Sequence, residues 1–155
     1  MSFEQAKAKL TIGSLDDSTT VSAQYNPKEL QVDKSVPWTK EKNSKADQPD
    51  LEFSSADGRS MSFELMFDTY EAGTSVHAEV EKLVKLAMVQ NPDGTEDKKR
   101  PPKVKVTWGT ALPAFLGVIE SVSTKYTMFL PGGSAVRAMC SCKFTEASRF
   151  SFGKK

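Results

Sequence analysis

The chain has 155 residues, of which 38% are hydrophobic and 26% are charged. This composition is typical of one globular domain, long enough to fold without disulfides or metals, and it favours neither a disordered nor a fibrous chain. The 21 basic and 20 acidic residues leave a net charge of +1, which argues against nucleic-acid specificity because that function needs a concentrated positive field.

Two features of the sequence bear on location and redox state. The segment Met1 to Gln5 lacks the basic and apolar stretches of a signal peptide, and no window approaches the roughly 20 apolar residues of a membrane-spanning helix. We therefore expect a cytoplasmic protein without membrane insertion. Cys140 and Cys142 lie two residues apart in an alternating segment, so they share a face and are expected to be reduced, buried thiols.

Most of the chain alternates apolar and polar residues with the period of two that is typical of half-buried strands. An Asp57-Gly58 turn between two of these segments predicts a hairpin of 51–53 with 60–68, and Pro131-Gly132-Gly133 predicts a second, longer hairpin. The expected strands, in chain order, are 6–12, 21–25, 51–53, 60–68, 104–108, 122–130 and 136–144.

One segment has the helical period instead. An apolar stripe runs along 76–87, Thr74 or Ser75 can cap its start, and Asn91 to Gly94 ends it. A single amphipathic helix in a chain of strands must pack on a sheet or on the open end of a barrel. The stripe consists of Val76, Val80, Leu83, Val84 and Ala87. We therefore predict a mainly β domain packed by one helix.

Residue types that carry chemistry are scarce. His77 is the only histidine, and the chain has neither a nucleophile elbow nor a phosphate-binding glycine loop. The two cysteines lack the further donors that zinc needs. Asp68 follows an apolar strand, where its carboxylate serves either catalysis or hydrogen bonds from turn amides, the second role being favoured. We predict no catalytic residue, cofactor or metal.

Several short strings, in a fixed order, resemble the tube proteins of contractile injection systems, a family often fused to a peptidoglycan-binding LysM module. Each string is weak alone, but the shared order extends from Tyr25 to Glu146. The strings are Tyr25-Asn26-Pro27 with Glu29, Phe67-Asp68-Thr69-Tyr70, Arg100-Pro101-Pro102, Trp108-Gly109, Gly117 to Val122, Tyr126 to Leu130, and Val136-Arg137-Ala138 with Ala135 where proline is usual.

The resemblance implies a tube-type β-barrel or sandwich, like that of phage tail tubes, with one helix. It also implies a six-membered ring between the spike or hub protein and the inner tube protein, next to other baseplate components in an injection particle or virion. The chain ends at Lys155, which leaves no room for a LysM module. We therefore expect 1–155 to be a single tube-type domain, and cell-wall binding is not carried over.

Some of these residues also have physical interpretations of their own. Pro27 ends the strand that contains Tyr25, and Pro101 and Pro102 suit a strand start, because proline donates no ladder hydrogen bond. Arg137 points away from the core face, where it either pairs with a carboxylate of the next subunit or is solvated.

A polar segment at 39–50 is expected to be an extended loop or arm, since long loops in compact domains are often functional. It lies between Trp38 and Leu51, which we expect to be anchored. In a ring, the arm would clasp an adjacent subunit or the next ring, with Lys40, Lys42 and Lys45 meeting acidic partners. A mobile, solvated loop is the alternative.

Other functions stay open at this level. A contractile phage tail tube or baseplate protein would have the same features. A small ligand-binding β-barrel would need an apolar pocket rather than a ring interface, and a hydrolase would need the catalytic group that the sequence lacks.

Overall fold

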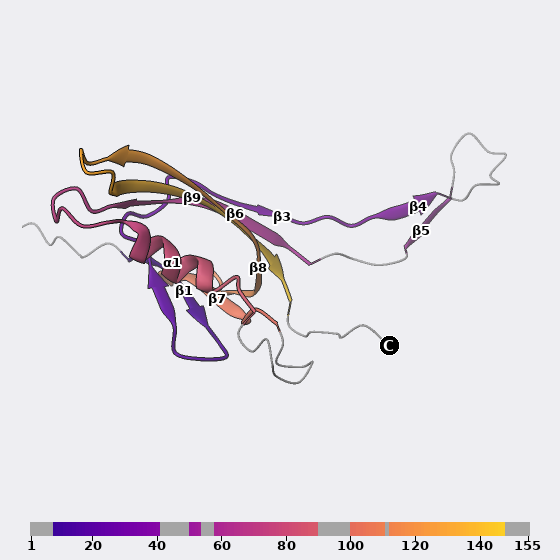
Figure 1. Cartoon of the computed structure of the whole chain (residues 1–155). Helices are drawn as coiled ribbons and strands as arrows, with labels where there is room; N and C mark the ends of the chain where they lie inside the picture. Colours follow the sequence, from indigo (N-terminus) through magenta and orange to yellow (C-terminus); the bar gives the residue numbers. More distant parts are fainter. Residues whose placement is uncertain (1–7, 41–49, 54–57, 90–99, 111, 148–155) are drawn as a thin grey trace, which may run out of the picture.

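The computed structural model describes residues 8–40, 50–53, 58–89, 100–110 and 112–147 (Figure 1). Within these residues the chain is mainly β with one helix, which confirms the predicted class. In chain order the elements are β1 (Leu10–Ser14), β2 (Thr20–Ser22), β3 (Leu30–Asp33), β4 (Trp38–Lys40), β5 (Leu51–Phe53), β6 (Ser60–Asp68), α1 (His77–Lys85), β7 (Val104–Trp108), β8 (Phe115–Phe129) and β9 (Ala135–Glu146).

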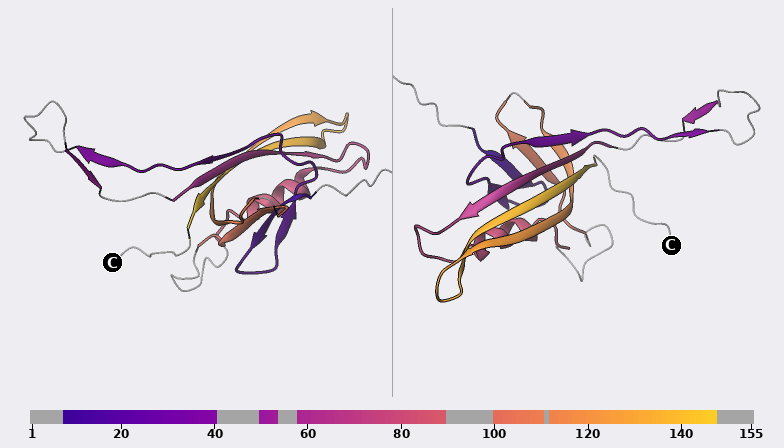
Figure 2. Two further views of the ribbon diagram at one scale, coloured as in Figure 1. Left: turned by 180° about the vertical axis from the view of Figure 1, so that it is seen from behind. Right: turned by 90° about the horizontal axis from the view of Figure 1, so that it is seen from above.

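Seven strands form one antiparallel sheet in the order β2-β1-β7-β8-β9-β6-β3, and β4 and β5 form a separate two-stranded sheet. Strand pairing does not close the large sheet, because β2 and β3 are its two edges. The sheet curves over α1, while the β4–β5 hairpin projects from one end of the body (Figure 1 and Figure 2). The fold is thus compatible with the expected barrel or sandwich.

The core lies between the sheet and α1. Alternate residues of β6 and β9 are buried, as the period of two predicts, and the rings of Phe63 and Phe144 stack with centroids 5.2 Å apart. The helical stripe supplies the other side of the core: Val76, Val80 and Leu83 are at most 3% exposed. These residues remove a large apolar area from water, which is the main force that holds the helix on the sheet.

The ends of the helix differ from the expectation. Ser75 accepts a hydrogen bond from the His77 N–H at 3.2 Å, so one of the two proposed capping side chains contributes there, although Val76 occupies the N-cap position itself. The regular helix ends at Lys85, and a tighter turn follows, in which the Met88 N–H donates to the Lys85 carbonyl. Residues 91–94 lie outside the described part of the chain.

The β8–β9 hairpin is confirmed and is longer than predicted. Gly133 has a φ of +96°, and its N–H donates to the Leu130 carbonyl at 2.8 Å, as a tight turn requires. Strand β8 begins at Phe115, seven residues before the predicted start at Val122, and its register with β9 shifts between Ile119 and Ser121. This β-bulge inserts one residue, so the core face passes from odd to even positions and the alternation looks interrupted in the sequence.

The predicted hairpin of 51–53 with 60–68 is wrong. Strand β5 pairs with β4, whereas β6 pairs with β9 and β3. The apolar face of β6 is buried in the core, so β6 pairs with the strands that share this core. All three residues of β5 are exposed, so β5 does not contribute to the core. Asp57 lies outside the described residues.

Three further expectations at the N-terminal half need correction. Thr39 and Lys40, expected in a loop, belong to β4. Trp38 and Leu51, expected to be anchored, are 53% and 55% exposed. Tyr25 is outside its strand and 47% exposed, because β2 ends at Ser22 and the chain then turns toward β3.

Candidate assembly surfaces

The described residues hold no recognisable catalytic centre. No three His, Cys, Asp or Glu side chains among them gather closely enough to bind a metal ion. His77 is exposed, with Nδ1 3.3 Å from the Tyr126 hydroxyl and Nε2 3.9 Å from a Glu81 oxygen. This set contains no activated nucleophile. Among the described helices, none has the length and apolar character needed to cross a membrane.

The two cysteines are buried, free thiols. Cys140 is 0% and Cys142 2% exposed. Burial raises the pKa of Cys140, and burial together with the neighbouring Cys140 raises the pKa of Cys142 to about 12. A thiol must ionise to act as a nucleophile or as a zinc ligand, so both cysteines serve as small core residues.

We expect the native protein at pH 8 to resist thiol-labelling reagents until it unfolds. Replacing both cysteines by Ala should lower the unfolding free energy by only about 1 to 2 kcal/mol and leave assembly intact. Labelling kinetics and urea midpoints test this, with Ser123→Cys in the cysteine-free background as an exposed positive control. Fast labelling of the native protein, or stoichiometric zinc in the purified protein, would contradict it.

The Asn26 side chain of the Tyr25-Asn26-Pro27 string and the Trp108 side chain both reach the start of β1. The Asn26 carboxamide donates to the Ala8 carbonyl at 2.8 Å and accepts from the Leu10 N–H at 3.0 Å. Trp108 Nε1 donates to the same Ala8 carbonyl at 3.1 Å. Pro27 is buried. Asn26 and Trp108 therefore have a common structural role in holding the start of β1.

Gln24, which the sequence analysis missed, does the same at the other side. Its carboxamide donates to the Asp68 carbonyl and accepts from the Asp68 N–H, both at 2.8 Å. The side chain thus satisfies the end of β6 as a neighbouring strand would. Together, Gln24 and Asn26 tie the connection between β2 and β3 to both β6 and β1. In the sequence, the only sign of this role is that Gln24 and Asn26 are polar and lie two positions apart.

The Phe67-Asp68-Thr69-Tyr70 string covers the end of β6 and the start of the turn that follows it. Phe67 is 2% exposed, and the Asp68 carboxylate accepts from the Tyr70 N–H at 2.9 Å. Arg137 Nε donates to the same carboxylate at 2.9 Å. Two hydrogen bonds lower the pKa of Asp68 below its usual value: the larger effect comes from the Tyr70 N–H and the smaller from Arg137. Asp68 therefore has the predicted turn role, and its own chain already holds Arg137.

The remaining motif residues shape the start and end of β7. Pro102 is fully buried two residues before β7, and Arg100 pairs with Asp16 at 2.7 Å. Pro101 is half-buried beside it. Gly109 follows the strand with a φ of +65°, in the left-handed region that favours glycine. Pro101 and Pro102 thus lie just before the start of β7 at Val104, which is consistent with the predicted strand start.

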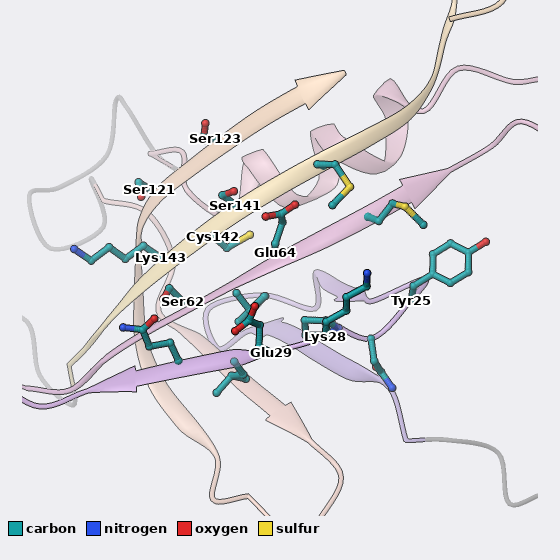
Figure 3. A pocket seen from close by; sticks show the side chains of 17 residues that line it. Tyr25, Lys28, Glu29, Ser62, Glu64, Ser121, Ser123, Ser141, Cys142 and Lys143 are labelled. Carbon is teal, nitrogen blue, oxygen red and sulfur yellow. The ribbon is translucent and has the colours of Figure 1, made fainter. Parts of the chain in front are cut away.

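The sheet has a second face opposite the core, which mixes polar side chains with Met66 and Met139. An open hollow of about 830 Å³ lies on this face across the neighbouring strands β8, β9, β6 and β3 (Figure 3). Ser62, Ser121, Ser123 and Ser141 line it beside charged groups that include Glu64 and Lys143. Because the hollow is open and its lining carries hydroxyl groups and charges of both signs, it lacks the character of an enclosed apolar ligand pocket.

Strand β8 has one edge that is mostly unpaired. It pairs with β9 along nearly its whole length but with β7 only from Phe115 to Gly117. From Val118 to Phe129, no strand among the described residues pairs with the second edge. The outer edge of β3 is likewise unpaired in this part of the chain. An edge strand presents N–H and C=O groups that can pair with another chain.

The β4–β5 hairpin is the third exposed feature. The Trp38 and Phe53 rings lie opposite each other across the two strands, with centroids 5.4 Å apart, and Lys40 pairs with Leu51. All six residues of strands β4 and β5 are exposed. Of the three predicted arm lysines, Lys40 belongs to β4, whereas Lys42 and Lys45 lie outside the described residues.

Comparison with known proteins places these features in a family. No curated protein matches the chain. The family model described as "Contractile injection system tube protein" matches residues 5–152. This match covers nearly the whole chain and includes every motif string considered above, from Tyr25 to Arg137. The chain therefore belongs to the contractile injection system tube protein family.

Proposed function

We propose that this chain forms a ring of six copies that connects the spike or hub protein to the inner tube of a contractile injection particle. A structural role in the tube follows from the family, whereas the ring, its partners and the absence of enzymatic activity are parts of the proposal. The chain would be made in the cytoplasm and then built into the particle. The observation that carries the proposal is the long unpaired edge of β8.

This edge fits the addition of a strand from another copy. Proteins normally cover, shorten or charge their sheet edges, since an unpaired edge is a site of association. From Val118 to Phe129 this edge is long, and no strand of the described residues covers it. The sheet also offers a second free edge, β3, at its opposite side. Pairing β8 of one copy with β3 of the next is a heterologous contact, which generates a ring when the rotation closes.

The two faces of the sheet support the same arrangement. Helix α1 and its core lie on one face, so a ring joined at the sheet edges has more room for them on the outside. The opposite face with Ser62, Ser121, Ser123 and Ser141 would then line a central channel. Charges there are mixed, and Lys143 pairs with Glu120 at 3.7 Å. The wall would also carry Met66 and Met139 among its serines and charged groups, so it would have a mixed polar and apolar character.

The expected contacts of single residues remain predictions within this proposal. Lys40, Lys42 and Lys45 would meet acidic residues of a neighbouring copy. Arg137 would need a second carboxylate at the interface, because Asp68 of its own chain already accepts from its guanidinium.

Mass photometry combined with hydrogen exchange tests the ring. Six copies of the 17.0 kDa chain give a particle of about 102 kDa. The amides that point to the free edges of β8, between Val118 and Phe129, and of β3 should exchange quickly in the dilute monomer and slowly in the ring, because pairing between copies satisfies them. A particle of another size, or protection confined to α1, would contradict the proposal.

Adjacent proline substitutions give a matched pair on the same strand. Successive residues of a strand direct their N–H groups to opposite edges, so one of Ser123→Pro and Thr124→Pro disrupts pairing with β9 while the other affects the free edge. The variant with a near wild-type unfolding midpoint identifies the free-edge position. We expect that variant to remain monomeric, and ring formation by it would contradict β8 pairing.

A further inference from the structure

The β4–β5 hairpin is joined to the body of the chain through two strands that run side by side. Asp33, at the end of β3, pairs with Ser60, at the start of β6. Lys34 therefore begins the outgoing connection, and Arg59 ends the returning one. We call Lys34 and Arg59 the base of the hairpin. Beyond this base the hairpin projects from the body in every view (Figure 1 and Figure 2), so the groups that hold the base decide where the hairpin points.

The carboxylate of Glu146, the last residue of β9, binds Arg59 through three hydrogen bonds. Arg59 Nε and Nη2 donate to Oε2 at 3.0 and 2.6 Å, and the Arg59 backbone N–H donates to Oε1 at 3.2 Å. The Glu146 N–H donates in return to the Arg59 carbonyl at 2.8 Å. The Glu146 side chain is 31% exposed, so water and salt screen this pair less than a pair on the open surface.

Two further contacts hold the returning connection in place. The Arg59 guanidinium lies 5.8 Å from the centroid of the Phe115 ring, within the range of a cation–π interaction. Phe115 is 1% exposed and begins β8, so it is a rigid support. A Cβ at Gly58 would lie 2.8 Å from the Glu146 carbonyl oxygen, which means that the chain approaches β9 as closely as only glycine permits. Strands β8 and β9 thus hold the same side of the base.

The same carboxylate interacts with the outgoing side of the base. The side-chain hydrogen bond from Arg59 lowers the pKa of Glu146 the most, and the positive charge of Lys34 adds a smaller reduction. Because charge interactions weaken with distance, this effect requires Lys34 to lie near the carboxylate. Glu146 therefore lies between cations that belong to the two connections of the hairpin.

The outgoing connection is short and stiff. Only three residues, Ser35, Val36 and Pro37, separate Lys34 from Trp38 at the start of β4. The proline ring fixes the φ of Pro37, and its clash with the preceding residue keeps Val36 extended. A direction set at the base is therefore carried to the hairpin.

We propose that Glu146 is a positioning residue, whose carboxylate between Arg59 and Lys34 fixes the direction in which the β4–β5 hairpin leaves the body. Two strands of three residues bury no core of their own, so without this anchor the hairpin swings as a unit about its base. A hairpin that is held in one direction loses less conformational freedom when it binds than one that swings. The anchor preorganises the hairpin within the single chain, and it does so whether or not the ring forms.

Double electron–electron resonance on the dilute full chain measures the direction of the hairpin. Spin labels at Thr39→Cys in β4 and Ser123→Cys in β8, both exposed positions, are introduced after Cys140 and Cys142 are replaced by Ala. This parent protein should give a single narrow distance distribution. Glu146→Gln keeps the size of the side chain and removes its charge, so the narrow peak should be lost while the urea midpoint stays close to that of the parent.

Glu120→Gln is the matched control. The Glu120 carboxylate accepts from Thr145 at 2.6 Å and pairs with Lys143 at 3.7 Å, rather than with the base of the hairpin. This variant removes an equally well-bonded carboxylate from the same sheet and should keep the narrow peak. A broad distribution in the parent, an unchanged peak in Glu146→Gln, or equal broadening by Glu120→Gln overturns the proposal.

Lys34→Gln distinguishes positioning from general structural support. Lys34 belongs to no strand of the described chain, so its replacement leaves the pairing of β6 with β9 intact. If Glu146→Gln also lowers the urea midpoint, Lys34→Gln decides: a broadened distribution supports the positioning role, and an unchanged one overturns it. All of these distances are measured in the monomer, so they stand apart from the outcome for the proposed ring.

Discussion

Replacing Leu83 by Asp is expected to abolish the stable folded state. Leu83 lies in α1, is 0% exposed and packs against the sheet. The substitution removes buried apolar area and places an unpaired carboxylate in the core, at a combined cost of about 5 kcal/mol or more. Since a domain of this size has roughly 5 to 15 kcal/mol of stability in total, we expect insoluble or unfolded protein by circular dichroism and size exclusion.

A graded series keeps this prediction measurable. Leu83→Ala should fold with an unfolding free energy reduced by about 3 kcal/mol in urea titrations. Glu81→Asp introduces the same new side chain at an exposed position of the same helix, and it should cost less than about 1 kcal/mol. Soluble Leu83→Asp protein with a wild-type melting profile would show that the apolar stripe faces solvent.

Replacing Gly117 by Ala is expected to be the most destabilising single-methyl change in the described sheet. A Cβ at this position would lie 2.0 Å from the Thr145 carbonyl oxygen, far inside van der Waals contact. Because the obstacle is the backbone of the paired strand β9, relief requires the two strands to separate. We expect a loss of about 3 kcal/mol of unfolding free energy, measured by urea titration.

Gly132 provides the matched control for this change. A Cβ there would meet nothing within 4 Å, and its φ is not in the left-handed region. Gly132→Ala should therefore leave the urea midpoint within the small range that is usual for surface substitutions, about 0.5 kcal/mol. Similar midpoints for Gly117→Ala and Gly132→Ala would show that β8 and β9 do not approach as closely as described.

The sequence by itself determined the parts of the fold that repeat along the chain. The alternation in 60–68 and 136–144 predicted the buried faces of β6 and β9, and the stripe from Val76 to Ala87 predicted the single helix and the side that it buries. These patterns report burial on one face, which local periodicity encodes directly. The motif strings added the family, and the match over residues 5–152 confirmed it.

Strand partners and assembly surfaces were decided only by the tertiary structure. Gln24 meets Asp68 across 44 residues and Arg137 meets Asp68 across 69, and no local pattern identifies such partners. The bulge after Ile119 changed the parity of β8 and hid its first half.

The β4–β5 hairpin and the free edge of β8 could not be predicted for the same reason. Periodicity records which residues turn inward, whereas an exposed aromatic pair or an unpaired edge is defined by what the rest of the chain leaves uncovered.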